Sequence, residues 1–165
     1  MDGRAAEYLA TARRRVAMGD VDAAGILYFA APYRWLEELF TGWLKDAGHP
    51  VSAMLRSQVA CPCVASAATY LAPLSLDDEI TLTLQPSSIG TTSFAVTAEA
   101  RRVDDGAVAV RATGWHVWAA FDGPDHPNIS PQVLPGWLQS ELTSIELTQP
   151  CISERSRVSP DAQLT

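Results

Sequence analysis

The feature that most constrains the fold is a broad apolar stripe between residues 32 and 47. Its apolar residues recur at spacings of three and four positions, as one face of an α-helix requires: Trp35, Leu36, Leu39, Phe40, Trp43, Leu44 and Ala47. Pro32 suits the first helical turn, and Gly48-His49-Pro50 supplies a glycine stop followed by a residue that cannot continue the helix. A stripe this wide and aromatic is too apolar for a surface helix, so we expect one long helix at the centre of the core.

An acidic turn leads directly into this helix. Asp20, Asp22 and Gly25 occupy a segment too short to be anything but a turn, which places both carboxylates near the helix start. The free N–H groups of a helix N-terminus attract negative charge. One interpretation is that one aspartate caps the helix while the other is solvated. The alternative is that the turn carries chemistry, and the two aspartates by themselves leave both interpretations open.

The rest of the chain predicts an antiparallel sheet. Apolar and polar residues alternate, imperfectly in the first case, over five segments bounded by turn residues: 11–18, 63–71, 79–85, 92–103 and 107–121. The last three are joined by short turns at residues 87–90 and 104–106, so they must be antiparallel. Short helices are predicted at residues 52–56 and 135–142. The layout is therefore α+β, a curved antiparallel sheet wrapped around one long central helix.

Length and composition fit one domain that binds a small molecule. The chain has 165 residues, of which 47% are hydrophobic, and its net charge is −7. We expect a single domain over residues 1–147 and a mobile tail over residues 148–165, which are rich in Ser, Gln, Pro and charge. Neither nucleic acid nor an anionic membrane attracts an acidic protein, so both are excluded as partners.

The sequence predicts a cytoplasmic protein that needs no metal. Residues 1–9 include Asp2 and Glu7 and lack an apolar run of signal-peptide length, and no stretch approaches the ~18 apolar residues of a membrane-spanning helix. The cysteines, Cys61, Cys63 and Cys151, are odd in number and lack a second C-x-x-C or a histidine at ligand spacing. We expect them to be buried free thiols.

Several enzyme classes lack their sequence motifs. There is no G-x-S-x-G, P-loop, G-x-G-x-x-G or H-E-x-x-H, which removes the support for serine hydrolase, nucleotide and zinc-protease chemistry. His49 is explained by the helix end, and His116 is interpreted as structural. Residues 23–28, just before the helix start, contain no histidine that could act there as a general acid or base.

The run that leads into the helix resembles the signature of the 4-hydroxybenzoyl-CoA thioesterase family of hotdog-fold enzymes. In that signature, D-x-D-x-x-G-x-x-Y/F feeds the central helix through a stretch that ends in R-W. This chain matches at Asp20, Asp22, Gly25, Arg34 and Trp35, and Tyr28, which precedes Phe29, stands at the Y/F position. A looser resemblance covers residues 10–121 and includes the step Tyr70-Leu71-Ala72-Pro73. The resemblance implies a hotdog fold and thioester hydrolysis without a cofactor.

The resemblance also implies roles for individual residues. Asp22 would be the catalytic carboxylate, acting as a base on water or as a nucleophile. Backbone N–H groups at Tyr28 and Phe29, in a donor set that reaches Ala30, would polarise the thioester carbonyl. Gly25 would lie in the substrate-binding turn, and Glu37 would approach the acyl group.

Two departures from the family pattern concern substrate binding. Ala31 and Pro32 replace the Asn and Tyr that members often carry at the helix entrance. Members also often place basic residues in the turn before the fourth strand, where they meet the phosphates of coenzyme A, whereas this chain has Gly90-Thr91-Thr92-Ser93. We therefore expect hydroxyl and N–H groups of Thr91, Thr92 and Ser93 to contact the carrier, without charge assistance.

The sequence thus predicts an acyl thioesterase that hydrolyses an acyl-CoA or another pantetheine thioester. We expect a homodimer or homotetramer whose active site lies between subunits, because a single sheet would leave its edges exposed. One alternative is a thioesterase of a polyketide-type pathway, with an acyl carrier protein as its partner. The other is a non-catalytic acyl-binding module that keeps the fold.

Overall fold

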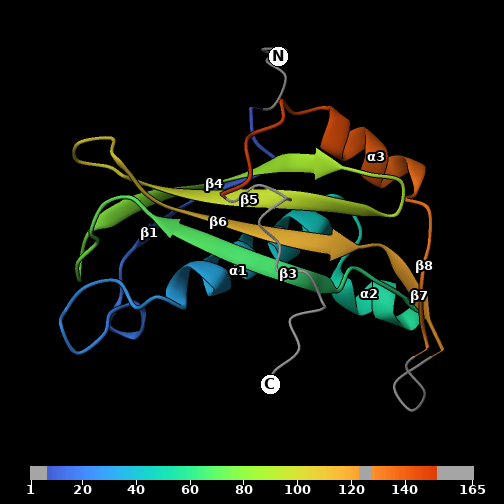
Figure 1. The fold of residues 1–165 in the computed structure, drawn as a ribbon, viewed down its shortest axis with the longest axis horizontal. Helices are drawn as coiled ribbons and strands as arrows, with labels where there is room; N and C mark the ends of the chain where they lie inside the picture. Colours follow the sequence, from blue (N-terminus) through green and yellow to red (C-terminus); the bar gives the residue numbers. More distant parts are fainter. Residues whose placement is uncertain (1–6, 123–127, 152–165) are drawn as a thin grey trace, which may run out of the picture.

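The computed structural model describes residues 7–122 and 128–151, and it wraps a curved antiparallel sheet around one long helix (Figure 1). The helix is α1 (Ala31–Asp46). The sheet has five strands, in the spatial order β1 (Ala10–Arg15), β4 (Glu79–Ile89), β5 (Ser93–Arg102), β6 (Val108–Val117) and β3 (Cys63–Tyr70). All neighbouring pairs are antiparallel. The predicted hotdog arrangement is confirmed.

The helix α1 forms and ends as its sequence predicts. Its buried face contains every apolar position of the predicted stripe within the helix: Trp35, Leu36, Leu39, Phe40, Trp43 and Leu44. At its end Gly48 adopts φ +87°, its N–H donates to the Lys45 carbonyl at 3.0 Å, and the His49 N–H donates to the Leu44 carbonyl at 2.8 Å. This is a Schellman motif, which needs the left-handed conformation that glycine adopts without strain.

The inner face of the sheet packs on α1. In β4 the inward side chains of Ile80, Leu82 and Leu84 are at most 3% exposed, as the predicted alternation requires. This strand continues to Ile89, past the turn predicted at residues 87–90. The register of its pairing with β5 shifts between Pro86 and Ser88, and this bulge absorbs a proline that cannot donate to the ladder.

A second, small sheet was not predicted. It consists of β2 (Val59–Ala60), β7 (Ala119–Phe121) and β8 (Ile129–Pro131), in the order β2-β7-β8. The predicted strand over residues 107–121 is therefore two strands, interrupted at Trp118, whose N–H donates to the Thr92 carbonyl. Strands of two or three residues are too short to show an alternating pattern.

Two short helices complete the layer of helices. The first, α2 (Val51–Arg56), follows α1 as predicted. The second, α3 (Gly136–Thr143), packs on the part of β4 beyond its pairing with β1, with Leu138 and Leu142 fully buried. The neighbouring Trp137 stacks on His49 at 3.7 Å between ring centroids. Helix α3 thus ties the end of α1 to the sheet.

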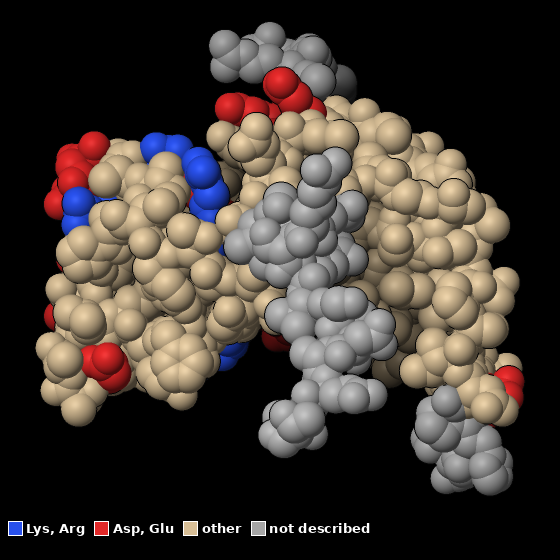
Figure 2. All heavy atoms as spheres, viewed as in Figure 1, with Lys and Arg blue, Asp and Glu red and all other residues tan. Residues whose placement is uncertain are grey.

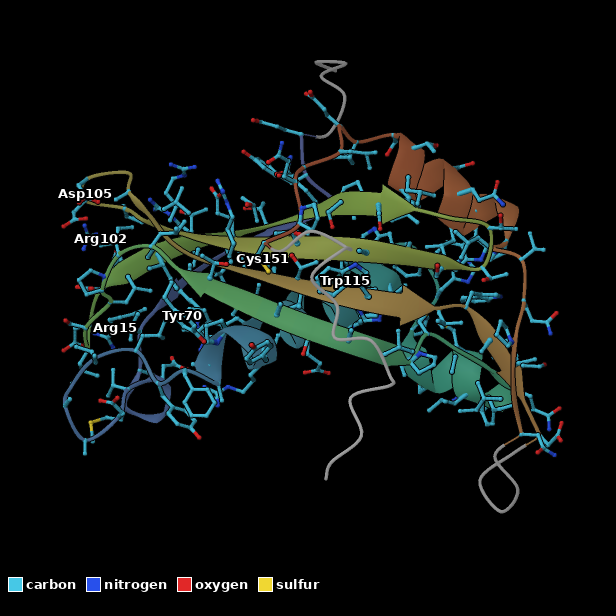
Figure 3. The ribbon with its side chains drawn as sticks, viewed as in Figure 1. Arg15, Tyr70, Arg102, Asp105, Trp115 and Cys151 are labelled. Carbon is cyan, nitrogen blue, oxygen red and sulfur yellow. The ribbon has the colours of Figure 1, made fainter. Side chains whose placement is uncertain are left out.

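The chain after α3 crosses the outer face of the sheet. The Thr148 N–H donates to the Pro86 carbonyl at 2.9 Å, and the Cys151 N–H donates to Thr113 Oγ1 at 3.0 Å. Figure 3 places Cys151 over the strands. Thr148 and Cys151 of the predicted tail therefore contact the sheet, and residues 152–165 lie outside the described residues. The domain boundary at residue 147 stays a prediction.

The three cysteines are free, as expected, but one expectation of burial was wrong. Cys63 is exposed because it begins β3, the outermost strand of the sheet, whereas Cys61 and Cys151 are half-buried. Burial raises the pKa of the Cys61 thiol to about 12. Within the described residues, no helix combines the length and apolarity needed to cross a membrane.

Candidate active site

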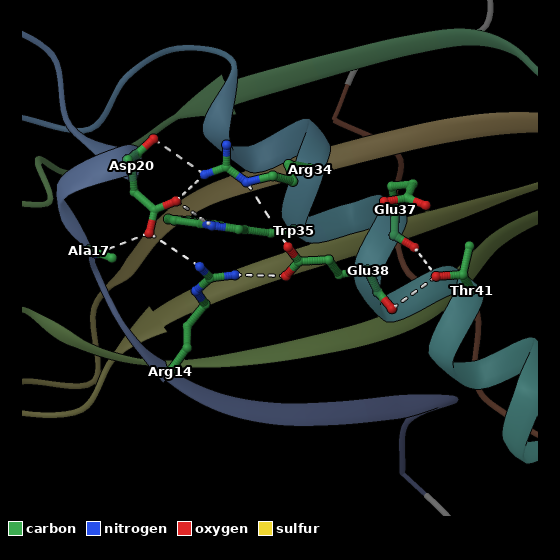
Figure 4. Close-up of polar contacts among 9 residues, drawn as sticks. Arg14, Ala17, Asp20, Arg34, Trp35, Glu37, Glu38 and Thr41 are labelled. Carbon is green, nitrogen blue, oxygen red and sulfur yellow. Dashed lines mark hydrogen bonds and ion pairs between the residues drawn. The ribbon is translucent and has the colours of Figure 1, made fainter.

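Asp20, the first aspartate of the acidic turn, is a buried structural anchor. Only 1% of its side chain is exposed, and four donors surround its carboxylate (Figure 4). Arg14 donates to Oδ2 at 3.2 Å, the Ala17 N–H donates to Oδ2 at 3.0 Å, and Trp35 Nε1 donates to Oδ1 at 3.2 Å. Arg34 also donates to Oδ1. Arg14 lies on β1, Trp35 and Arg34 lie on α1, and Ala17 is the N-cap residue of the 3-10 turn η1 (Met18–Asp20), which contains Asp20 itself. Asp20 therefore joins three elements.

The surroundings of Asp20 favour its charged form. Burial acts to raise the pKa of the carboxyl, but the Ala17 N–H, the charge of Arg14 and the hydrogen bonds from Trp35 and Arg34 outweigh it and hold the pKa below the ordinary value of Asp. Arg14 also forms a 2.8 Å ion pair with Glu38 on α1. Of the two interpretations of the acidic turn, the one in which an aspartate caps α1 is wrong, since the N-cap residue is Ala30 and no side chain caps the helix.

Asp22, the second aspartate, lies on an exposed turn. Its carbonyl accepts the Gly25 N–H at 2.9 Å, and its Oδ1 accepts the Ala24 N–H at 2.8 Å, which closes an Asx turn. Gly25 has φ +75°, a left-handed conformation that glycine adopts without strain. No other hydrogen bond or ion pair from a described residue engages the Asp22 carboxylate. Unlike Asp20, it keeps most of its hydrogen-bonding capacity.

The loop between this turn and α1 presents two unused backbone donors. The Tyr28 N–H, one of the predicted oxyanion donors, instead donates to the Asp20 carbonyl at 2.7 Å. The Tyr28 carbonyl accepts the Ala31 N–H at 2.9 Å, and the Phe29 carbonyl accepts the Tyr70 hydroxyl. Both peptide planes are therefore fixed through their oxygens. Within the described residues, the N–H groups of Phe29 and Ala30 have no acceptor.

These donors border an apolar cleft of about 410 Å³. It is lined by Phe29, by Ile26 and Leu27 of the loop, and by residues 70–74 at the end of β3. Figure 3 places Tyr70 at that end of β3, on the side of the loop before α1. Phe29 is 64% exposed and Tyr70 is 46% exposed, although partial burial still raises the pKa of Tyr70. Apolar side chains this exposed favour a ligand or a partner over the cleft.

Within one chain, the predicted site residues do not meet in one place. Asp22 lies at the tip of the turn, outside the lining of the cleft. Glu37 lines a second hollow, farther along α1. The turn of Thr91, Thr92 and Ser93 joins β4 to β5 at the opposite end of the sheet, where the Leu134 N–H donates to the Thr91 carbonyl.

Three arginines of β5 and β6 that could bind phosphate are already paired with carboxylates. Arg101 and Arg111 both contact Glu99, at 2.5 and 2.9 Å, and Arg102 contacts Asp105 at 2.5 Å. Figure 2 shows acidic and basic side chains side by side at the end of the molecule that carries the β5–β6 turn. In the part of the chain that the structure describes, no group of three or more His, Cys, Asp or Glu side chains could hold a metal ion.

Two contacts were not predicted from the sequence: Arg14 with Asp20, and Tyr70 with the Phe29 carbonyl. Arg14 was one of three adjacent arginines, a pattern that is usually solvated, and only its position on the same strand face as Val16 indicated burial. Tyr70 was part of the family resemblance, but its contact with Phe29 joins residues 41 positions apart. Local patterns in a sequence do not encode such a contact.

Comparisons with known proteins agree with the fold and the motif. The model of the thioesterase-like superfamily matches residues 16–138, well over half of the chain. A 1,4-dihydroxy-2-naphthoyl-CoA hydrolase of Prochlorococcus marinus (strain NATL1A) is 34% identical over 91 residues, which cover 50% of this chain and 61% of that protein. The chain spans about 60% of the length of the first curated relatives that it matches.

Two solved structures illustrate the likeness of fold. A 1,4-dihydroxy-2-naphthoyl-CoA thioesterase from Synechocystis has a TM-score of 0.70 and 22% identity, with 81% of this chain and 94% of that chain covered. The 4-hydroxybenzoyl-CoA thioesterase of Pseudomonas has a TM-score of 0.68 and 22% identity, with 80% and 97% covered. The resemblance inferred from the acidic turn is confirmed, and the chain belongs to the thioesterase-like superfamily.

Proposed function

We propose that the protein is an acyl thioesterase that hydrolyses an acyl-CoA, or another pantetheine thioester, to a free acid and a thiol. The observation that carries this proposal is the pair of unused N–H groups at Phe29 and Ala30, held in fixed peptide planes beside an apolar cleft. Preorganised donors of this kind stabilise the oxyanion that develops when a thioester carbonyl is attacked. The expected use of the Tyr28 N–H is not part of the proposal, because Asp20 already accepts it.

In this proposal, Asp22 drives the attack on the thioester carbonyl carbon, either as a base or as a nucleophile. As a base, its carboxylate takes a proton from water while the water oxygen attacks the carbonyl carbon. As a nucleophile, it attacks the carbon itself and forms an anhydride that water then cleaves. In both routes the C–S bond breaks and the departing thiolate takes up a proton. Single-turnover hydrolysis in ¹⁸O-labelled water identifies the nucleophile route when water cleaves the anhydride at the Asp22 carbonyl, because an unlabelled Asp22 oxygen then leaves with the product.

A homodimer would unite the separated parts of the site. Strand β3 is the outer strand of the sheet, and Val64 on it is 59% exposed. Exposed edges of this length are normally paired or covered. If β3 pairs antiparallel with its own copy, Tyr70 of one chain lies near the start of β3 of the other chain. The cleft at Phe29 then faces the partner subunit's second hollow.

Light scattering tests the assembly. We expect at least a homodimer, and Val64→Lys should raise the dimer dissociation constant by about tenfold or more, because it places a charge on the pairing edge. A wild-type monomer that hydrolyses thioesters would contradict this arrangement.

A substrate panel tests the activity. We expect thiol release from acyl-CoA substrates, and aromatic acyl groups should be among the best, because the relative from Prochlorococcus is named for 1,4-dihydroxy-2-naphthoyl-CoA. Binding of acyl-CoA without any thiol release would instead support a non-catalytic acyl-binding module. Dependence on a carrier protein, with acyl-CoA inactive, would support the polyketide-type alternative.

A further inference from the structure

A second hollow of about 320 Å³ lies beside the middle of α1, bounded by α2 and by residues 59–63. The mechanism above does not use it. Its walls are largely apolar and include Phe40, Leu44 and Met54. Pockets for small molecules combine such walls with a few polar groups that fix the ligand's orientation. The identity of those polar groups therefore indicates what the hollow can bind.

His116 is the most deeply buried polar group of this hollow. It is 5% exposed, and its ring stacks on Phe40 with centroids 4.1 Å apart. Its Nδ1 lies 3.1 Å from the Cys61 carbonyl oxygen. Because a carbonyl oxygen can only accept, Nδ1 carries the hydrogen and Nε2 of the neutral ring is an acceptor. Burial lowers the pKa of His116, with the Cys61 hydrogen bond opposing, and so favours this neutral ring.

The Nε2 atom has no hydrogen-bond partner within the described residues. The nearest thiol, that of Cys63, points to the Ala65 carbonyl oxygen at 3.1 Å instead. Gly114 leaves room for the ring, since a Cβ there would lie 2.9 Å from Nε2. Nε2 is not among the fully buried side-chain atoms that lack a partner, so it is accessible from the hollow, where water or a ligand hydroxyl can donate to it. An apolar ligand that displaced this water without replacing its hydrogen bond would lose about 1–3 kcal/mol.

Two other polar side chains at the hollow, Thr41 and Glu37, can also accept a hydrogen bond. The Thr41 hydroxyl donates to the Glu37 carbonyl at 2.9 Å, so its hydrogen is already used. The Glu37 carboxylate, an acceptor when ionised, makes no hydrogen bond or ion pair with a described residue. The hollow thus combines apolar walls with three side-chain acceptors, on His116, Thr41 and Glu37, which suits an apolar ligand that carries a hydroxyl group.

We infer that this hollow binds the acyl group of the substrate, and that His116 Nε2 determines specificity by accepting a hydrogen bond from a hydroxyl on that group. The inference rests on the proposed thioesterase function, and it adds the residue of this chain that distinguishes an acyl group with a hydroxyl from one without. A volume of about 320 Å³ suits one or two rings. In the proposed dimer the hollow borders the start of β3 and faces the partner subunit's Tyr70, so the acyl group can extend from the cleft of one chain into the hollow of the other.

Matched substrates test the role of His116. The ratio to measure is kcat/KM for the better of 3- and 4-hydroxybenzoyl-CoA divided by kcat/KM for benzoyl-CoA. We expect about tenfold or more for the wild type, because benzoyl-CoA leaves the acceptor unpaired. His116→Phe keeps an aromatic ring against Phe40 but removes the acceptor, so the ratio should fall below about threefold.

A control variant separates this effect from a general change in the fold. His49→Phe removes a histidine that stacks on Trp137 and does not line the hollow, and it should leave the ratio unchanged. A wild-type ratio below threefold, or an undiminished ratio in His116→Phe, would overturn the inference while leaving thioester hydrolysis established.

A binding measurement covers the case in which His116→Phe does not fold or no acyl-CoA is hydrolysed. In wild-type protein with ¹⁵N-labelled histidine, saturation with 4-hydroxybenzoate or 3-hydroxybenzoate should shift the Nε2 resonance of His116, while benzoate should not. Equal shifts, or none with any of the three acids, would contradict the inference. This result does not depend on turnover, so it separates failure of the acyl site from failure of the proposed function.

Discussion

The cluster around Asp20 and the turn that carries Asp22 are two residues apart and use their carboxylates in opposite ways. Asp20 is buried and receives hydrogen bonds from two arginines, a tryptophan and a backbone N–H. Asp22 is exposed and receives one local hydrogen bond. The Asp20 carboxylate binds donors from β1 and α1 and so holds the two elements together, while the Asp22 carboxylate remains available to a substrate.

The same contrast extends to the backbone that follows. The Asp20 carbonyl fixes the Tyr28 N–H, whereas the next two N–H groups point to no described acceptor. Backbone groups that already form hydrogen bonds therefore fix the positions of the two N–H groups that do not. Rigid support of this kind is what a preorganised oxyanion site requires.

The largest effect expected from this contrast is on turnover when Asp22 is changed. Asp22→Asn keeps the side-chain oxygen that accepts the Ala24 N–H but removes the negative charge. The variant should fold as the wild type does, with turnover lower by at least ~100-fold, about 2.7 kcal/mol of activation free energy. Steady-state kinetics and circular dichroism check both parts. An equal loss of turnover in Asp20→Asn would favour a paired-carboxylate site over separate roles.

Asp20→Asn should lower stability more than Asp22→Asn does. It leaves Arg14 and Arg34 without their buried counter-charge, so we expect a loss of about 2 kcal/mol in the free energy of unfolding, measured by urea titration. The pKa of Asp20 is lowered in the folded protein, so its contribution is present above the unfolded value near 4 and is lost as pH falls through the folded value. The variant should therefore lose less stability than the wild type between pH 4 and pH 2.

An exposed pair provides the control for Asp20. Asp77 lies 3.5 Å from Arg15, and both side chains are 68% exposed. Asp77→Asn should change the free energy of unfolding by no more than ~0.5 kcal/mol. If both variants cost the same, burial does not distinguish the Asp20 cluster from a surface ion pair.

The sequence predicted the fold better than it predicted this division of roles. The stripe of α1 and the alternation of β4 depend on periodicity within a few turns or residues, and both were confirmed. The small sheet of β2, β7 and β8 was missed because strands this short carry no period. Element type follows from local pattern, whereas pairing of short segments follows from where the rest of the chain places them.

For the site, the motif indicated the right loop but not which groups in it are free. Only the structure places Asp20 under Arg14, a contact between β1 and the turn, and only the structure places the Tyr28 N–H on Asp20. Hydrogen bonds of this kind depend on side-chain direction across elements. The catalytic role of Asp22 stays a prediction.

A change at Tyr70 tests whether the free N–H groups need the hydrogen bond that holds the Phe29 carbonyl. Tyr70→Phe removes the hydroxyl that fixes the Phe29 carbonyl but keeps the ring in the cleft. We expect kcat to fall by roughly tenfold, about one hydrogen bond, with a smaller change in KM. Tyr33→Phe, whose hydroxyl makes no hydrogen bond to a described residue, is the matched control. An unchanged kcat in Tyr70→Phe would mean that the peptide planes hold without this contact.

The smallest effect concerns the carrier, and it tests the turn of residues 90–93 at the opposite end of the sheet. Like the groups around Asp20, backbone groups of this turn already form hydrogen bonds within the protein. The Gly90 N–H donates to the Ser93 carbonyl at 2.7 Å, and no basic residue lies in the turn. The adenosine phosphates should therefore supply little transition-state stabilisation. We expect kcat/KM for an acyl-pantetheine to lie within about tenfold of that for the matching acyl-CoA, at most ~1.4 kcal/mol, with little dependence on salt. If acyl-CoA wins by several hundredfold at low salt and loses that advantage as salt rises, Arg101 or Arg111 must leave Glu99 to meet the phosphates.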